Sequence, residues 1–125
     1  MDYAGIFTDE VLEELLPAGR SDEFFEALYG DAEDGAYDIR LAFVGDDNGA
    51  LRFEFRLHQR PGKCLACNLT YGLPQVFGRH PLLNVKGIVA RIDELTGKTS
   101  GASAFTLGAT YEISHNLHAI PMTVA

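Results

Sequence analysis

The chain has 125 residues, of which 46% are apolar and 22% charged, and its formal net charge is −8. This length suits one domain with a buried core, and the apolar share is too high for a disordered chain. No apolar run approaches the length of a membrane span, the acidic first residues are unlike a signal peptide, and an acidic chain repels phosphate, so we expect no membrane or nucleic-acid partner and a cytoplasmic location.

The charge is distributed unevenly along the chain. Residues 1–38 carry twelve acidic side chains against one basic side chain, Arg20, whereas residues 39–125 carry six acidic and nine basic ones. We expect a single α+β domain over residues 1–125, with an acidic helical segment at 1–36 and a sheet plus a long helix at 37–125. The acidic segment is interpreted first as a solvated face, and otherwise as a partner for the basic remainder or for a basic protein.

Two short helices are predicted in the acidic segment. Thr8 is placed to cap the first, Leu12 begins its apolar face, and Pro17 closes it. Ser21 is placed to cap the second, and Gly30 is placed to end it.

Two strands with one apolar face each are predicted next, joined by the turn DDNG. Apolar residues alternate with polar ones through both runs, which is typical of an antiparallel sheet covered on one side. The apolar set is Tyr37, Ile39, Leu41, Phe43, Leu51, Phe53, Phe55 and Leu57.

A third strand is predicted after a loop of Pro61, Gly62 and Lys63. A two-residue loop would make the apolar faces of the two strands disagree, whereas this three-residue loop pairs Leu57 with Cys67, Phe55 with Leu69 and Phe53 with Tyr71 and keeps the apolar side chains on one face.

The two cysteines, Cys64 and Cys67, have the C-x-x-C spacing of zinc knuckles and redox pairs. Residues three apart on a strand point to opposite faces, so their thiolates would not converge on one ion. We therefore interpret them as structural thiols and expect no metal and no cofactor. If a metal were bound, the ligands would be Cys64, Cys67, His115 and His118.

The longest helix is predicted over residues 81–96, where the apolar spacing gives a stripe wide enough to cover a sheet. Gly87 within it indicates close approach to another group. A fourth strand is predicted through Phe105 and Ile113, with Tyr111 on its apolar face. The last strand follows a turn at His115 and Asn116, and Pro121 within it predicts a sheet edge.

The fold class predicted is therefore α+β, in the order ααβββαββ, with an antiparallel five-stranded sheet and the long helix packed on one face. This order, with the acidic charge, resembles that of the acidic, dimeric secretion chaperones, although the helix that closes their fold has no counterpart after the last predicted strand. The resemblance covers topology and charge and implies binding of an extended segment of a client protein.

The candidate binding residues lie in two places. Arg52, Arg56, His58 and Arg60 share the outer face of the second strand. They either form ion pairs with Glu54 and the acidic helices, or they dock an anionic ligand or an acidic partner segment. Tyr71, Phe77 and His80 lie on a loop that either packs as a crossover or rims a pocket beside the long helix.

No catalytic motif occurs in the sequence, so no catalytic residues are assigned and an enzyme is not favoured. The function expected is that of a non-catalytic protein-interaction domain, homodimeric and chaperone- or adaptor-like, whose partners are a second copy and a segment of another protein. The alternative is a small-ligand or zinc-binding protein, or an enzyme, that uses a pocket between the long helix and the sheet.

Overall fold

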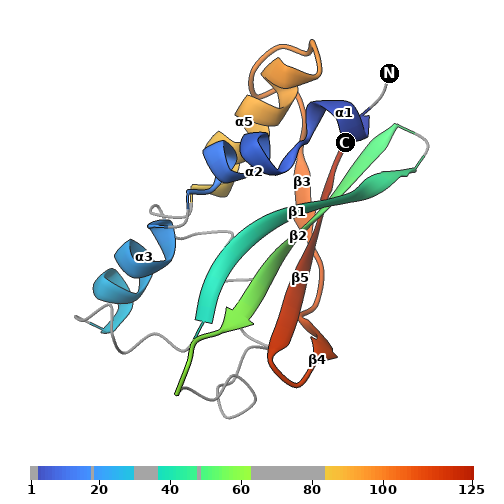
Figure 1. The fold of residues 1–125 in the computed structure, drawn as a ribbon. Coiled ribbons are helices and arrows are strands. Elements are labelled where there is room, and N and C mark those ends of the chain that lie inside the picture. The colour runs from blue at the N-terminus through green and yellow to red at the C-terminus, as the bar shows by residue number, and fades with distance from the viewer. Residues whose placement is uncertain (1–2, 18, 30–36, 48, 63–83) are drawn as a thin grey trace.

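The computed structural model describes residues 3–17, 19–29, 37–47, 49–62 and 84–125, with only the backbone at 24–25 and 27–29. Short helices come first and strands follow (Figure 1). The helices are α1 (Tyr3–Ile6), α2 (Asp9–Leu15), α3 (Arg20–Tyr29) and α5 (Val85–Leu95). The strands are β1 (Tyr37–Asp47), β2 (Ala50–Gln59), β3 (Phe105–Leu107), β4 (Tyr111–Ser114) and β5 (Leu117–Val124).

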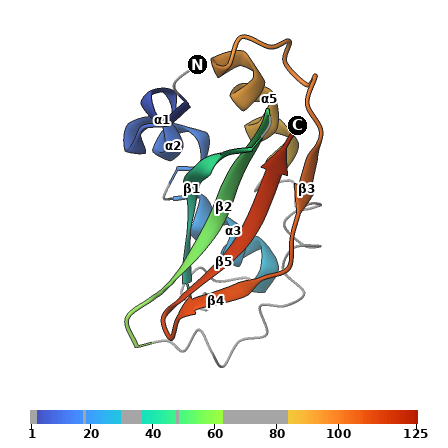
Figure 2. The same cartoon turned by 90° about the vertical axis from the view of Figure 1, so that its right-hand side faces the viewer.

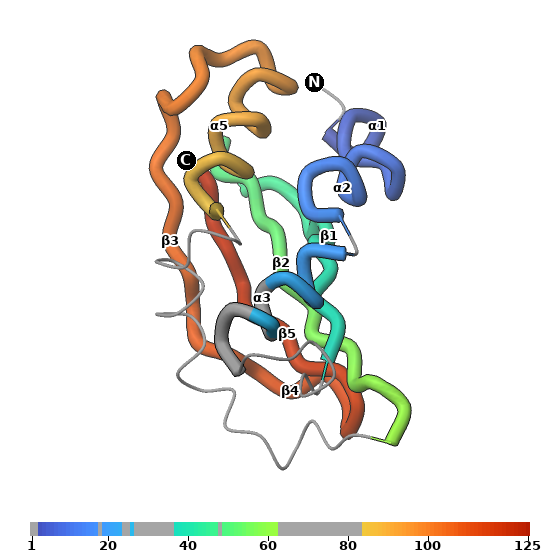
Figure 3. Tube along the Cα trace, turned by 90° about the vertical axis from the view of Figure 1, so that its left-hand side faces the viewer, coloured from blue at the N-terminus to red at the C-terminus, as the bar shows by residue number. Residues whose placement is uncertain are grey.

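The five strands form one antiparallel sheet in the order β1-β2-β5-β3, and β4 also pairs with β5. All described helices lie on one side of this sheet: in Figure 2 α3 and α5 are behind the strands while α1 and α2 are seen beside β1, and in Figure 3 this side faces the viewer. The predicted α+β class and the antiparallel five-stranded sheet are confirmed. None of the described helices is long and apolar enough to cross a membrane.

Strands β1 and β2 pair as the alternation predicts. Ile39 lies opposite Leu57, Leu41 opposite Phe55 and Phe43 opposite Phe53. These side chains point towards the helices, and Phe53, Phe55 and Leu57 are almost completely buried. We call this helix-covered side the inner face and the opposite side the outer face.

Helix α2 begins as predicted, since the Thr8 side chain accepts a hydrogen bond from the Val11 amide. The residue before the cap, Phe7, packs on Phe43 and Phe53 with ring centroids 5.1 and 5.0 Å away. These aromatic contacts attach the N-terminal helices to the inner face of the sheet.

The role expected for Ser21 is wrong. Helix α3 begins at Arg20, so Ser21 lies inside it and does not cap it. Its hydroxyl instead accepts a hydrogen bond from the Ile39 amide at 2.8 Å. This bond uses the backbone amide of Ile39 on the edge of β1 that is not paired with β2, which we call the outer edge of β1. The predicted stop at Gly30 lies outside the described residues.

The long helix is shorter at its start than the predicted range of 81–96. Asn84 has a left-handed backbone (φ 48°) and caps α5, so the helix begins at Val85, and residues 81–83 lie outside the described part. A Cβ on Gly87 would overlap the Asn84 side chain, which is the close approach its position indicated. The inward side chains of α5 join the core of the sheet; they are Val85, Ile88, Val89 and Ile92.

The expected neighbour of β2 is wrong. Its second edge pairs with β5, which places Phe55 opposite Ile120 and Leu57 opposite His118. Since β1 occupies the first edge, β2 has no edge left for the predicted pairing of Phe53, Phe55 and Leu57 with residues 67–71. Those partner residues lie outside the described part of the chain.

Pro121 is therefore in an interior strand and not at the predicted sheet edge. Its carbonyl accepts a hydrogen bond from the Gly108 amide at 2.8 Å, so its ring nitrogen faces the same side. On that side β5 faces the gap between β3 and β4, where no strand residue needs a hydrogen-bond donor from position 121. Proline has no N–H to donate, and it stands at the break that divides the predicted fourth strand into β3 and β4.

The register of the last hairpin also differs from the expected one. Ser114 pairs with Leu117 as predicted, but the register shifts between Glu112 and Ser114. Tyr111 consequently lies opposite Ala119 on the outer face. The shift adds one residue to β4, and another added residue between β3 and β4 places Phe105 and Leu107 back on the inner face.

Gly108 is expected to be intolerant of a side chain, because an added Cβ would lie 2.7 Å from the Pro121 ring. Gly108→Ala should lower the free energy of unfolding by about 1–3 kcal/mol. The same change in a Pro121→Ala background should cost less, as urea denaturation of the four proteins would measure.

Gly45→Ala is the matched control, because nothing lies near its added Cβ. Equal costs for Gly108→Ala in both backgrounds would contradict the contact.

Candidate functional site

The outer face of the sheet carries the charged side chains of β1 and β2. Cross-strand pairing places Arg40 opposite Arg56 and Asp38 opposite His58. On the other side of β2, Arg56 lies opposite Ala119 and Glu54 opposite Pro121. Arg40 of β1 and Arg56 of β2 therefore form a row of positive charge, which we call the cationic row, beside small and apolar side chains of β5.

Glu54 is the buried acid at the centre of this face, with only 8% of its side chain exposed. The Arg56 guanidinium donates to one carboxylate oxygen at 2.9 Å, and the Tyr111 hydroxyl donates to the other. Since β5 separates Tyr111 from β2, the phenol side chain crosses over β5, where the alanine opposite it is fully buried. The hydrogen bond to Glu54, followed by burial and the charge of Glu54, raises the pKa of Tyr111.

Arg40 and Arg56 are like charges placed directly opposite each other, an arrangement that costs free energy without a counter-ion. Arg56 has its counter-ion in Glu54, whereas no ion pair of Arg40 occurs among the described residues. His58 lies beside both arginines. Burial first, then the charges of Arg40 and Arg56, lower the pKa of His58 against the opposing effect of Asp38.

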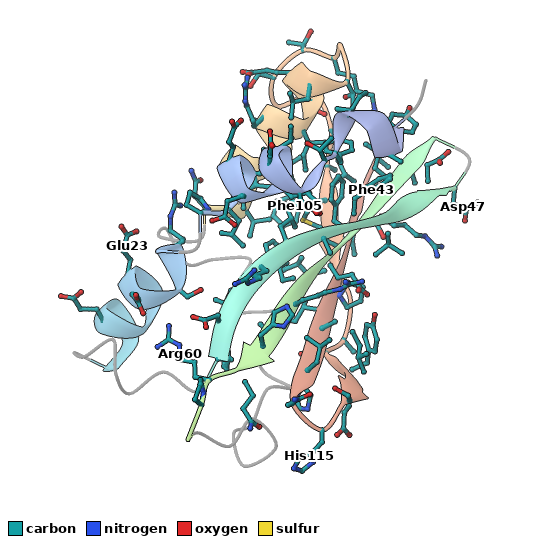
Figure 4. All side chains as sticks on the ribbon, in the orientation of Figure 1. Glu23, Phe43, Asp47, Arg60, Phe105 and His115 are labelled. Atoms are coloured by element: carbon teal, nitrogen blue, oxygen red, sulfur yellow. The ribbon has the colours of Figure 1, made fainter. Side chains whose placement is uncertain are left out.

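The two other predicted arginines hold parts of the fold together. Arg60, only 15% exposed, is directed from the end of β2 towards α3 and pairs with Asp22 at 2.8 Å and Asp38 at 3.0 Å (Figure 4). Arg52 pairs with Asp47 at the β1–β2 turn at 3.3 Å. Of the predicted cationic set, Arg56 and His58 are thus the two that share a site with Arg40.

A groove runs between α2 and the outer edge of β1. One cavity there, of about 360 Å³, is bordered by α1, α2, both faces of β1 and the outer face of β2; its residues include Phe7, Arg40 and His58. A second cavity of about 320 Å³ lies beside it against α2. Arg40, Leu41, Asp9 and Leu12 border both cavities. The groove therefore combines an apolar floor with the cationic row.

The remaining predicted residues do not add to this site. Tyr71, Phe77, His80, Cys64 and Cys67 lie outside the described residues. His115 is exposed at the β4–β5 turn, and His118 is buried on the inner side of β5, as expected. The described part of the chain holds no group of three or more side chains suited to a metal ion.

A third cavity, separate from the groove, lies between α5 and β3 and away from the cationic row. Its volume is about 450 Å³. The residues that border it are Lys86, Val89, Gly101, Ser103, Ala104 and Phe105. Buried Asp93 shapes this region, because its carboxylate accepts a hydrogen bond from the Ser103 amide at 3.0 Å.

The pKa of Asp93 reflects two opposed effects. Burial raises it, but the hydrogen bonds from Ser103, the charge of Lys98 and the bond from the Gly101 backbone outweigh burial and leave the pKa of Asp93 below its ordinary value.

Sequence reasoning did not select Arg40 or Tyr111 as site residues. The alternation already places Arg40 on the same face as Arg56, but its position opposite Arg56 depends on the register shift between Phe43 and Gly45. Tyr111 could not have been found, because the register shift that moves it to the outer face has no signal in the alternation of β4.

Comparisons with protein-family models, with curated proteins and with solved structures found no match for this chain.

Replacing Tyr111 by Phe removes the hydroxyl donor to a buried carboxylate. We expect the free energy of unfolding to fall by about 1–3 kcal/mol, because hydrogen bonds to charged groups exceed neutral ones. Tyr3→Phe, a partly buried tyrosine against the core, is the control. Equal denaturation midpoints for the two variants would show that the bond to Glu54 adds no stability.

The lowered pKa of His58 makes stability depend on pH. Below the ordinary histidine pKa of about 6.5, the unfolded chain binds a proton at this position more readily than the folded one. Stability should therefore fall as pH drops below that value, and His58→Gln should reduce the fall. In NMR titrations, the pKa of His58 should rise in Arg40→Gln; a wild-type pKa at or above the ordinary value would contradict the account.

Proposed function

We propose that this chain is a non-catalytic protein-interaction domain that pairs with a second copy and binds a segment of another protein. The observation that supports this most is the one-sided cover of the sheet: the described helices all lie on the inner face. The outer face and the two sheet edges are then the surfaces available for partners.

The two edges differ in chemistry, which suits two different partners. The β1 edge carries the cationic row described above. At the opposite side, β4 pairs only with β5 among the described strands, and all four of its residues are exposed. Two of them are large and apolar, Tyr111 at 43% and Ile113 at 44% exposure. An exposed apolar edge strand is suited to pairing with a copy of itself about a two-fold axis.

The experiment is light scattering with size-exclusion chromatography on the wild type and two variants. We expect a dimer for the wild type and a monomer for Ile113→Lys, because lysine on an edge opposes strand pairing. Val44→Lys is the matched control, since Val44 is also apolar and 53% exposed but lies in β1.

A monomeric wild type at micromolar concentration would contradict the pairing. A dimer that persists in Ile113→Lys would contradict the assignment to β4.

The second candidate function is binding of a small ligand or of zinc. The cavity between α5 and β3 favours a small ligand, since it lies between the long helix and the sheet as expected for that alternative. Elemental analysis that finds zinc in proportion to protein, and its loss in Cys64→Ser, would favour a metal protein over the interaction domain.

A further inference from the structure

The outer edge of β1 offers backbone groups that no described residue occupies beyond Ile39. The Ile39 amide points outward, because it donates to Ser21 on α3. Residues two apart on a strand point their amides and carbonyls the same way, so Leu41 and Phe43 present theirs to the same edge. Their side chains face the core, whereas the backbone of Arg40 and Ala42 bonds to β2. At this edge the Ser21 side chain thus occupies the backbone of Ile39, and no described residue bonds to the backbone of Leu41 or Phe43.

The groove between α2 and β1 gives an added strand a place to lie. Leu41 borders both cavities of the groove, so the groove runs along the β1 edge at this residue. On the inner side it is bordered by Phe7 and Leu12, and on the outer side by Arg40 and Ala42. A strand placed there would turn alternate side chains to an apolar surface and to a cationic one.

The charged residues of the groove determine which polar side chains an added strand would need. Arg40 has no ion pair among the described residues, because Asp38 beside it is held by Arg60 and Glu54 is held by Arg56. Asp9 and Glu13 are the acids on the helix side of the groove, and no ion pair joins Asp9 to Arg40. A carboxylate at the outer position next to Arg40 would supply the missing counter-ion of the Arg40–Arg56 pair.

We propose that the β1 edge binds an extended peptide of another protein in which apolar and acidic side chains alternate, as an added strand. The proposal rests on the interaction function above and names the partner of its cationic edge. A second copy is disfavoured at this edge. Two β1 strands paired about a two-fold axis would place both copies of Arg40 on one continuous face, where like charges repel.

The probe is a blocked synthetic peptide of alternating valine and glutamate, titrated by calorimetry into the wild type and into Ile113→Lys. The matched peptides replace glutamate by lysine, or methylate the backbone nitrogens of one alternate set or the other. Because the protein carries a net charge of −8, long-range attraction favours the lysine peptide. Preference for the glutamate peptide would therefore report the local arginine.

We expect the glutamate peptide to bind and the lysine peptide not to bind. Methylation of one set, the set that faces β1, should abolish binding, and methylation of the other set should not. Arg40→Glu should weaken binding about tenfold or more, while Arg52→Glu, an outer-face arginine paired with Asp47 away from the groove, should change it less than about twofold.

Three results would overturn the proposal: no binding of the glutamate peptide, equal binding of both methylated peptides, or equal effects of Arg40→Glu and Arg52→Glu. Since Ile113→Lys leaves the β1 edge intact, binding to both proteins is expected. Failure of the peptide beside a wild-type dimer would refute this inference and leave self-pairing in place. Binding to a wild type that is monomeric would support this inference and refute self-pairing.

Discussion

The packing of Phe7 against Phe43 and Phe53 is the contact on which the rest of the arrangement depends. The three rings lie within 5.0 to 5.3 Å of one another by their centroids. They attach the N-terminal helices to the same face that α5 covers, so the sheet has one core and not two. This contact holds α1 and α2 on the inner side, where the side chains of α5 also join the core, so no described helix covers the outer face.

The outer face is covered by no described helix, but its side chains form a defined network around Glu54. Glu54 is buried there because Tyr111 crosses β5 to reach it and Arg56 neutralises it. A buried carboxylate with both oxygens bonded fixes β2, β5 and β4 relative to one another. Arg40 is the neighbouring charge that this network leaves without a described counter-ion, and it sits where the open edge begins. The opposed arginines therefore connect two features: Arg56 belongs to the network around Glu54, and Arg40 belongs to the edge where we propose that a peptide binds.

Local patterns predicted a good part of the fold. The alternation around the DDNG turn determines which residues of β1 and β2 face inward, and Thr8 begins α2 as its capping position indicates. What local patterns do not contain is the pairing of β2 with β5, which joins residues from 59 (His58 and Leu117) to 73 (Leu51 and Val124) positions apart and also makes the strand of Pro121 interior. Ser21 has a cap residue's identity but bonds Ile39, because the tertiary contact replaced the local one.

The candidate site was predictable to the same degree. Arg56 and His58 were placed correctly on the outer face, but only the three-dimensional arrangement shows that Arg60 is tied to Asp22 and Asp38. Tyr111 entered the site through a register shift, and Arg40 gained its importance from the counter-ions of its neighbours.

Amide hydrogen exchange along β1 in the free protein tests the central claim most directly, because it reports each backbone donor separately. The amides of Arg40 and Ala42 should exchange slowly since they bond to β2, and that of Ile39 should be protected by Ser21. The amides of Leu41 and Phe43 should exchange much faster. Protection of Leu41 and Phe43 equal to that of Arg40 and Ala42 would show that the edge is already occupied and would contradict the account.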